Sequence, residues 1–508
     1  MVRLRFFEVH PVLAFSSAVL ALAAVACCGD CGGGKRDLDL VGAPVEASAP
    51  DGGEPKRAAA DAAGLRNRFV FDLIQDLVFR QRRDGWTLTT PGAHVNVEKL
   101  RAAGVDLLLA AIAPLPGRDP AEALEAQLSA TEELVEATGG AMRIVVGLEE
   151  ADEARRRGVI PVMVLLEGAD ALVGKDDELY DLRRRGLAAV GLVGSHSNGA
   201  GDSVSDPRDP GGLTTAGAEL VAALRDHSLA LDLTHATREL FWDVLVGQHV
   251  PAMVSHAGAR ALREHPRNLD DLQILALARS GGVLGLVFNP DLLVAGQGQA
   301  SIEDVVAHAE HVKAIGALEA LALGTDYGGI RPPRGLDDVS RLPALVEALR
   351  AAGWTEEEID GLLGGNARTF FERVERRVGT AEIAEREPGR PIALECETLI
   401  GEAEGAPALA CDGYLTRPAA ELPPESRQRL RLHEMDRTPS RLELFGDPGT
   451  PWQVEAQNLE GEVIVQRVVM IGENGRGSLS MPADRGLTRL FLSPTRPSAL
   501  REAVVWGR

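Results

Sequence analysis

The sequence predicts an α/β protein, in which a (βα)8 barrel of the TIM type is followed by a small all-β domain. Between Arg68 and Val374, short apolar runs alternate with amphipathic segments of helical length, which is typical of a parallel sheet covered by helices. After Arg377, short apolar stretches are separated by Gly, Pro and Asp, as in all-β units. At 508 residues the chain is too long for one ordinary core, which agrees with two domains.

The composition restricts the class of protein. Apolar residues make up 45% of the chain and charged residues 25%, as in soluble globular proteins. The net charge of −22 disfavours a nucleic-acid partner, because phosphate binding needs clustered Lys and Arg. We interpret the negative charge as an aid to solubility.

The first 26 residues have the features of a signal peptide. Arg3 and Arg5 precede an apolar run that is too short to span a bilayer comfortably but suits a signal-peptide core. Ala24 and Ala26 then precede Cys27. This arrangement resembles a bacterial lipoprotein signal, which implies lipidation of Cys27 and anchoring in a membrane. The alternative is ordinary secretion with cleavage nearby, and in both cases we expect the chain to be exported to the cell envelope.

Composition also suggests where the domains begin and end. Residues 27–64 are rich in Gly, Ala, Pro, Asp and Lys without periodicity, so we expect a flexible tether. We expect the barrel at 65–378 and a small β-sandwich-like domain at 379–508. Cys396 and Cys411 could form a disulfide in an oxidising compartment or remain two free thiols.

Eight apolar runs predict the strands of the barrel. Capping patterns support the helices between them: Ser301 with Asp304 begins one helix and Thr355 with Glu358 another. The predicted strands are residues 68–76, 105–114, 159–168, 187–196, 229–235, 251–258, 281–289 and 320–327.

Polar or ionisable residues end six of these runs. The carboxyl ends of the strands carry the active site of such a barrel. Six polar side chains at one end are improbable as independent packing solutions, because each would need its own buried partner. A shared metal centre would satisfy most of them, although any one histidine alone could simply be hydrogen-bonded at a strand end. The six residues are Asp76, Glu167, His196, His235, His256 and Asp326.

Several motifs occur in a characteristic order. They are LLEGAD around Glu167, SHSN around His196, LDLTH, VSHAGARALREHPRN, LGTDYGGI and GWTEEEIDGLLGGNARTFF. In this order and spacing the chain resembles the membrane dipeptidase (renal dipeptidase) family of zinc peptidases in the amidohydrolase superfamily. The resemblance extends over about Arg68 to Val374.

The resemblance implies metal ligands. Glu167 would bridge two zinc ions, His235 and His256 would complete the shell of one ion, and Asp76 would belong to the other. Imidazole suits zinc, and a carboxylate can bridge two cations.

The resemblance also implies residues that act on the substrate. Asp326 would handle the proton, His196 would face the scissile carbonyl, and Arg267 would hold the substrate carboxylate. Arg pairs with a carboxylate through two parallel hydrogen bonds, which fits the last role.

The chain departs from the family at one ligand position. The family opens with a His-x-Asp pair, whereas Ile74 stands where the histidine is expected, two residues before Asp76. One zinc position therefore keeps only Asp76 and Glu167. The other keeps a His2Glu set with room for water, so we expect one zinc ion rather than two.

These features lead to two hypotheses. The first is a zinc-dependent hydrolase that cleaves the amide bond of dipeptides or related small acyl amino acids with metal-activated water. The second is a degraded site, in which the barrel is an envelope-tethered binding or structural module. The oligomeric state stays open, and a homodimer is one option.

Other conspicuous residues have simpler interpretations. We expect His308 and His311 to be solvent-exposed on a polar helix face. His94 is the candidate for a surrogate metal ligand. The glycine-rich stretch at 362–366 follows one helix and precedes another, so we expect a packing turn.

Overall fold

The computed structural model describes two regions of the chain. The predicted signal peptide, tether and lipidation site at Cys27 lie outside the described residues, as do Cys411 and the side chain of Cys396. The described residues are 65, 68–113, 117–208, 211–248, 250–296, 299–377, 390–391, 394–400, 421–422, 427–432, 439–458, 462–481, 487, 489–495 and 498–507.

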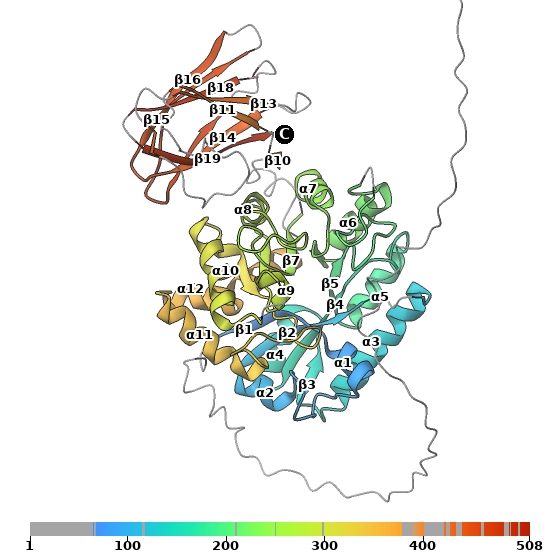
Figure 1. Cartoon of the computed structure of the whole chain (residues 1–508). Coiled ribbons are helices and arrows are strands. Elements are labelled where there is room, and N and C mark those ends of the chain that lie inside the picture. The colour runs from blue at the N-terminus through green and yellow to red at the C-terminus, as the bar shows by residue number, and fades with distance from the viewer. Residues whose placement is uncertain are drawn as a thin grey trace, which may run out of the picture. The chain divides into compact units, whose positions relative to one another are not determined.

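Eight parallel strands close into a barrel in the first region, which confirms the predicted fold (Figure 1). Each strand pairs with the next along the ring, and pairing of β2 with β4 and of β9 with β1 completes it. The barrel strands are β1 (Val70–Gln75), β2 (Val105–Ile112), β4 (Ile160–Leu166), β5 (Leu187–Gly191), β6 (Ala230–Asp232), β7 (Ala252–Ala257), β8 (Val283–Leu286) and β9 (Leu321–Leu323).

A short additional strand was not predicted. β3 (Met142–Ile144) pairs with the first residues of β4, before β2 joins that strand. Only Met142 of its three residues is buried. A segment this short and exposed has no recognisable apolar pattern.

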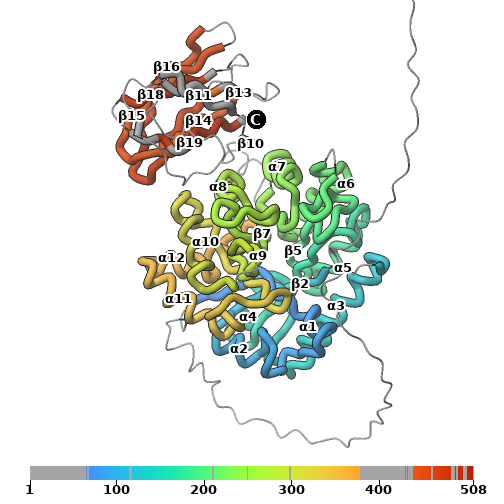
Figure 2. The backbone as a smooth tube through the Cα atoms, in the orientation of Figure 1, coloured from blue at the N-terminus to red at the C-terminus, as the bar shows by residue number. Residues whose placement is uncertain are grey.

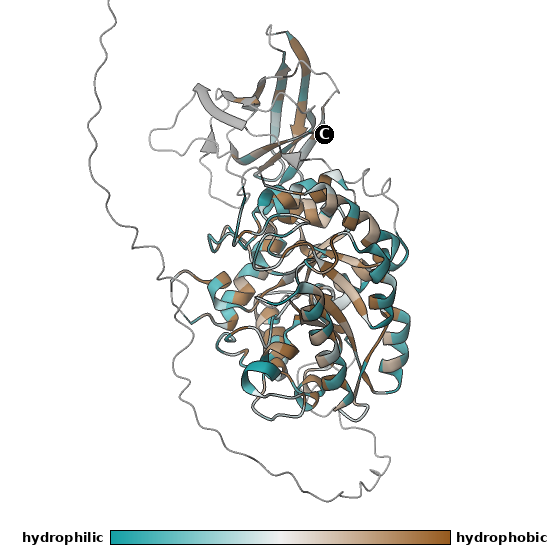
Figure 3. Ribbon diagram, turned by 90° about the vertical axis from the view of Figure 1, so that its right-hand side faces the viewer, coloured by the Kyte–Doolittle hydropathy of each residue, from teal (hydrophilic) through white to brown (hydrophobic). Residues whose placement is uncertain are grey.

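Helices surround the barrel strands, as the tube in Figure 2 shows. In Figure 3, the central strands are largely hydrophobic and the helices carry hydrophilic stripes, as expected for helices that bury one face. The helices are α1 (Leu77–Asp84), α2 (Val97–Ala102), α3 (Pro120–Glu136), α4 (Gly147–Arg156), α5 (Leu179–Arg184), α6 (Thr215–Asp226), α7 (Arg238–Gly247), α8 (Asp271–Arg279), α9 (Pro290–Leu293), α10 (Ile302–Ala314), α11 (Leu342–Ala351), α12 (Glu356–Asp360) and α13 (Asn366–Glu375).

The predicted helix starts and the packing turn are present. The backbone N–H of Thr355 donates to Glu358 at 2.8 Å, and that of Ser301 donates to Asp304 at 2.8 Å. Between α12 and α13, a Cβ on Gly364 would lie 2.5 Å from the carbonyl oxygen of Phe69. The glycine-rich stretch therefore lets this turn pack directly against the backbone next to β1.

The barrel interior is an apolar cluster. Leu109, Met163 and Met253 belong to it, and Phe371 of α13 packs on Phe71 with ring centroids 5.3 Å apart. Ile74 is also part of this cluster and is fully buried.

None of the described helices is both long enough and apolar enough to span a bilayer.

The second region is an all-β unit, as predicted. Trp452, Leu430 and Val505 from its two antiparallel sheets share one buried cluster, as in a sandwich. The domain boundaries at 378 and 379 stay predictions. One sheet contains β10 (Arg390–Pro391), β12 (Glu421–Leu422), β14 (Pro439–Gly446), β17 (Arg476–Ser480) and β19 (Ser498–Gly507); the other contains β11 (Leu394–Ile400), β13 (Arg427–Leu432), β15 (Pro451–Gln457), β16 (Val463–Met470) and β18 (Arg489–Pro494).

Two glycines allow the last strands of the barrel to approach β7. A Cβ on Gly285 of β8 would lie 1.8 Å from the carbonyl oxygen of Ser255, and one on Gly324 would lie 2.0 Å from the same oxygen. Because the clashing atom belongs to the backbone, we predict that Gly285→Ala lowers the free energy of unfolding by about 2–3 kcal/mol. Chemical denaturation measures this change.

The matched control is Gly247→Ala. Gly247 is exposed at the end of α7, and a Cβ at this position would have no atom within 4 Å, so alanine should leave stability unchanged or raise it slightly. Equal stabilities for the two variants would contradict the close approach at Ser255.

Candidate metal centre

Three side chains converge at the carboxyl ends of the barrel strands. Glu167 follows β4, His235 follows β6, and His256 lies near the end of β7. Each offers one ligand atom, and these atoms lie within 4.8 Å of one another. Nε2 of His235 is 3.5 Å from a carboxylate oxygen of Glu167. In the described part of the chain, no other group of three His, Cys, Asp or Glu residues meets this criterion.

Hydrogen bonds determine which nitrogen of His256 can bind a cation. The hydroxyl of Ser255 donates to Oδ2 of Asp232 at 2.7 Å, so it accepts from Nδ1–H of His256, which is 3.0 Å away. The proton is therefore on Nδ1, and the lone pair is on Nε2. An outer hydrogen bond of this kind orients a histidine for metal binding.

Asp232 was not predicted as part of the site. It is buried on β6 and accepts four hydrogen bonds, two from Thr234 and two from Ser255. A carboxylate within the otherwise apolar run LALDL is the signal that could have revealed it, since a buried charge needs partners. Burial raises the pKa of Asp232 despite these hydrogen bonds.

The backbone is strained at two residues of the site. His235 has φ of 69° and Asp326 has φ of 59°, and they are two of the four non-glycine residues with positive φ among those described. Such conformations persist only where surrounding structure imposes them, and they cluster at functional sites. In addition, Nδ1 of His235 is buried without a hydrogen-bond partner among the described residues.

Two further carboxylates lie beside Glu167. A Cβ on Gly329 would be 2.7 Å from Oδ1 of Asp326 and 3.3 Å from Oδ2 of Asp76, so both side chains approach this glycine. Burial, and then the charge of Glu167, raise the pKa of Asp76 to about 7. Burial, Glu167 and Asp76 also raise the pKa of Asp326 well above its usual value. Three crowded carboxylates and two histidines make a donor set that fits a divalent cation such as zinc.

Asp76 lies outside the group of three converging ligand atoms. Asp76 caps α1, because Oδ1 accepts from the backbone N–H of Phe79 at 3.2 Å. Ile74 offers no ligand atom and is packed in the barrel interior. His94 lies outside the group of ligand atoms, with its ring 5.4 Å from Trp86 and 6.3 Å from Tyr327.

Arg267 reaches the centre from the loop after β7. Its Nη2 donates to Nε2 of His256 at 2.8 Å. The loop is held by Asn268, whose Oδ1 accepts from the backbone N–H of Gly258 at 2.8 Å. It is also held by His308, whose Nδ1 accepts from the backbone N–H of Ala259 at 2.9 Å. These bonds fix the backbone on both sides of Arg267.

The expected exposure of His308 and His311 is wrong, because both are buried. They lie three residues apart on α10, on the same buried face as Val305 and Val312. Nε2 of His308 donates to the carbonyl of Leu293 at 3.1 Å, which leaves its Nδ1 free to accept. The charged Glu310 between them concealed this inward face in the sequence.

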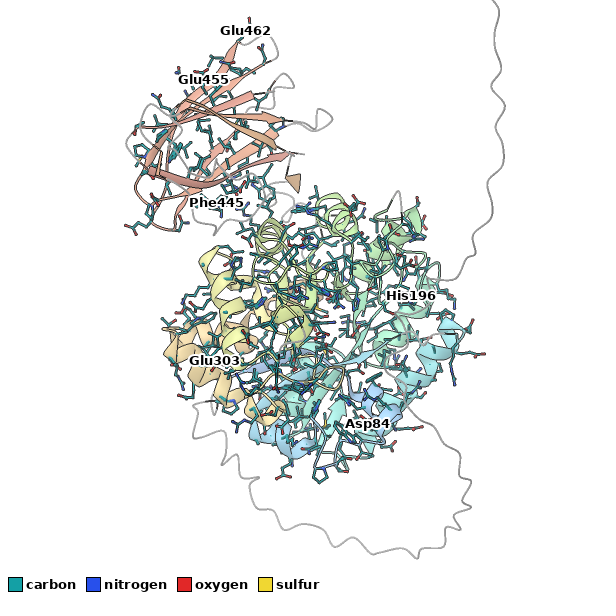
Figure 4. All side chains as sticks on the ribbon, viewed as in Figure 1. Asp84, His196, Glu303, Phe445, Glu455 and Glu462 are labelled. Atoms are coloured by element: carbon teal, nitrogen blue, oxygen red, sulfur yellow. The ribbon has the colours of Figure 1, made fainter. Side chains whose placement is uncertain are left out.

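His196 lies apart from the three converging side chains. Its side chain is 46% exposed, and Nε2 donates to Oδ1 of Asp170 at 2.8 Å. Figure 4 labels the position of His196 in the barrel region. The other oxygen of Asp170 accepts from the amide of Asn198 at 3.1 Å. Asp170 was not predicted, although it is part of the motif LLEGAD. This pair orients the imidazole of His196 in the loop after β5. The predicted position of His196 at the strand end is wrong, because β5 ends at Gly191.

We predict that Ser255→Ala weakens zinc binding by 10- to 100-fold, on the order found for outer-shell partners of metal ligands. The variant removes the acceptor of Nδ1–H of His256. Competition with a chromophoric chelator measures the affinity. Ser280→Ala is the control, because Ser280 is a similarly buried residue whose hydroxyl, among the described residues, donates to the carbonyl of Leu277 at the end of α8. An unchanged zinc affinity in folded Ser255→Ala would refute this role.

We also predict a pH-dependent effect of Asp76→Asn on stability in the presence of chelator. Because the folded-state pKa of Asp76 is about 7, the folded protein binds more protons there than the unfolded chain, and stability falls as pH rises from about 4 to 7. Asparagine still caps a helix but carries no charge. The free energy of unfolding of Asp76→Asn, minus that of the wild type, should therefore increase by on the order of 2 kcal/mol between pH 4 and pH 8. The exposed Asp226, replaced by Asn, should show no comparable trend.

Comparison with known proteins places this chain in a family. Residues 62–384 match the family model for membrane dipeptidases, peptidase family M19. An uncharacterized protein in the pqqA 5' region of Klebsiella pneumoniae is 31% identical over 260 residues, which are 50% of this chain and 96% of that protein. Dipeptidase 3 of Homo sapiens is 33% identical over 166 residues, which are 32% of this chain and 34% of that protein.

Solved structures agree with this match. A dipeptidase AC, a metallopeptidase of family M19, aligns with a TM-score of 0.56 and 27% identity over 61% of this chain and 99% of that chain. A metallopeptidase from Rhodobacter sphaeroides, liganded with a phosphinate mimic of the dipeptide L-Ala-D-Ala, aligns with a TM-score of 0.54 and 25% identity over 60% of this chain and 99% of that chain. Because the family model matches more than half of its 508 residues, this chain belongs to the membrane dipeptidase family, peptidase family M19.

Proposed function

We propose that the protein is a dipeptidase that works with one zinc ion held by Glu167, His235 and His256. The observation that carries the proposal is the convergence of these three side chains, with the lone pair of His256 on Nε2. A His2Glu set leaves a coordination position for water, as in single-zinc hydrolases. When bound, the ion would lower the pKa of that water and polarise the substrate carbonyl.

The surrounding residues would supply the other parts of the reaction. Asp326 would take a proton from the attacking water and pass it to the leaving amine. Burial and the charges of Glu167 and Asp76 raise the pKa of this carboxyl group. In its doubly protonated form, His196 would donate from Nδ1–H to the carbonyl oxygen as charge develops there, because its Nε2–H is donated to Asp170.

The proposed substrates are dipeptides or related small acyl amino acids with a free carboxylate. Glu167 and Asp326 attract the guanidinium of Arg267 electrostatically. This guanidinium would pair with the carboxylate of the substrate. The phosphinate dipeptide mimic bound by the Rhodobacter sphaeroides relative supports this substrate class. On the basis of the leader sequence, we further propose export to the cell envelope with a lipid anchor at Cys27.

A second candidate is a binding or structural module without catalytic metal. Ile74 removes one expected ligand, and the guanidinium of Arg267 already contacts His256, both of which favour this alternative. Metal analysis of the purified protein separates the two. About one zinc per chain supports the enzyme, two would require a further ligand near Asp76, and none supports the module.

We predict that His256→Ala loses zinc and lowers kcat/KM for dipeptide hydrolysis by at least about 1,000-fold, because one of three protein ligands disappears. Metal content and hydrolysis of L-Ala-D-Ala are measured together. His227→Ala removes an imidazole at the end of α6 instead and should retain both properties. Full activity of His256→Ala in metal-free form would end the proposal.

A further inference from the structure

The side chain of Arg267 occupies the one nitrogen that His256 can offer to a metal. Its Nη2 lies 2.8 Å from Nε2 of His256. Arginine has only donors, so Nε2 must accept this hydrogen bond with its lone pair. The other ring nitrogen, Nδ1, carries the proton that is donated to Ser255 at 3.0 Å. An arginine hydrogen bond and a metal bond at His256 therefore exclude each other.

The carboxylates around Arg267 stabilise its present position. The same carboxylates would also attract a divalent cation, which would then compete with the guanidinium. Glu167, Asp326 and Asp232 all attract the guanidinium electrostatically. A divalent cation at the His2Glu set would bring twice the charge to the same carboxylates and would repel the guanidinium. Arg267 thus acts as an internal cation at the place where the ion would bind.

The loop geometry allows the side chain to leave while the backbone stays. The backbone N–H of Arg267 donates to His265 at 3.2 Å, and the amide of Asn268 donates to the carbonyls of Arg263 and Leu292 at 2.9 and 2.8 Å. In contrast, Nε of Arg267 is buried without a hydrogen-bond partner in the described part of the chain. Loss of the bond to His256 would therefore break no hydrogen bond of Nε in that part of the chain.

We propose that zinc and Arg267 compete for Nε2 of His256, so that zinc binding releases the guanidinium to bind the substrate carboxylate. The inference rests on the proposed function. In this scheme, the substrate carboxylate can bind Arg267 only when zinc is bound. The coupling between zinc and the carboxylate is reciprocal, so a carboxylate that binds Arg267 must also strengthen zinc binding.

The first measurement is the zinc affinity of the full chain and of Arg267→Gln, by competition with a chromophoric chelator. Glutamine removes the guanidinium, so zinc should bind on the order of tenfold more tightly, equivalent to about 1.4 kcal/mol. Arg260→Gln is the matched control: it removes the same charge from the same loop, but Arg260 pairs with the exposed Glu264. Its zinc affinity should stay within about twofold of wild type.

The second measurement separates competition from simple charge repulsion, because loss of a nearby positive charge alone could tighten zinc binding. Zinc affinity is measured again with saturating propionate, a carboxylate that cannot be hydrolysed. In the wild type, zinc should then bind several-fold more tightly, and in Arg267→Gln propionate should have no effect. Persistence of the propionate effect in Arg267→Gln would show that the carboxylate binds the metal directly, which overturns the release of Arg267.

The remaining outcomes distinguish this inference from the proposed function. If the wild type binds zinc and cleaves dipeptides but folded Arg267→Gln binds zinc no more tightly, the competition is refuted and the enzyme remains. If neither protein binds zinc while thermal unfolding shows both to be folded, the proposed function and the competition fail together. Thermal unfolding of each variant in chelator provides the check on folding.

Discussion

The centre depends on one buried carboxylate. Asp232 accepts hydrogen bonds from the backbone and side chains of Thr234 and Ser255, and so ties the carboxyl end of β6 to β7. His235 and His256 each directly follow one of these hydroxyl residues in the chain. Without these hydrogen bonds, the ends of β6 and β7 would not be fixed relative to each other, and neither would the imidazoles of His235 and His256. The cost of burying this carboxylate is offset by the four donors that it receives.

The same device recurs on the opposite side of the barrel. Asp72 on β1 accepts from the backbone N–H and hydroxyl of Thr325 at 3.0 and 2.5 Å. Thr325 directly precedes Asp326, so this bond holds the end of β9 as Asp232 holds the end of β7. Two buried aspartates thus prepare the positions of the candidate ligands and of the candidate proton carrier. The hydrogen bonds to Asp232 and Asp72 therefore hold in place the backbone next to side chains that come from distant segments of the chain.

Much of this architecture was predictable from the sequence. The eight strand runs are short, almost continuously apolar and bounded by glycine or polar residues, so these apolar runs located the strands. Their terminal polar residues indicated where Glu167, His235 and His256 would meet, because parallel strands end at the same face of a barrel. The partners that orient them were not predicted, since hydrogen bonds such as that between Ser255 and Asp232 join segments with no shared local pattern. His308 was misjudged for a similar reason: its burial depends on the loop after β7, which helix periodicity does not describe.

The left-handed backbone at His235 and Asp326 restricts which residue types can replace them during evolution. Outside glycine, asparagine, aspartate and histidine adopt such φ values several-fold more often than other residues. Bulky or branched apolar residues are disfavoured at these two positions before any chemistry is considered. Selection for folding alone would therefore keep ligand-type side chains there, even in descendants that no longer hydrolyse anything. Position 74, within the extended strand β1, is not subject to this backbone constraint.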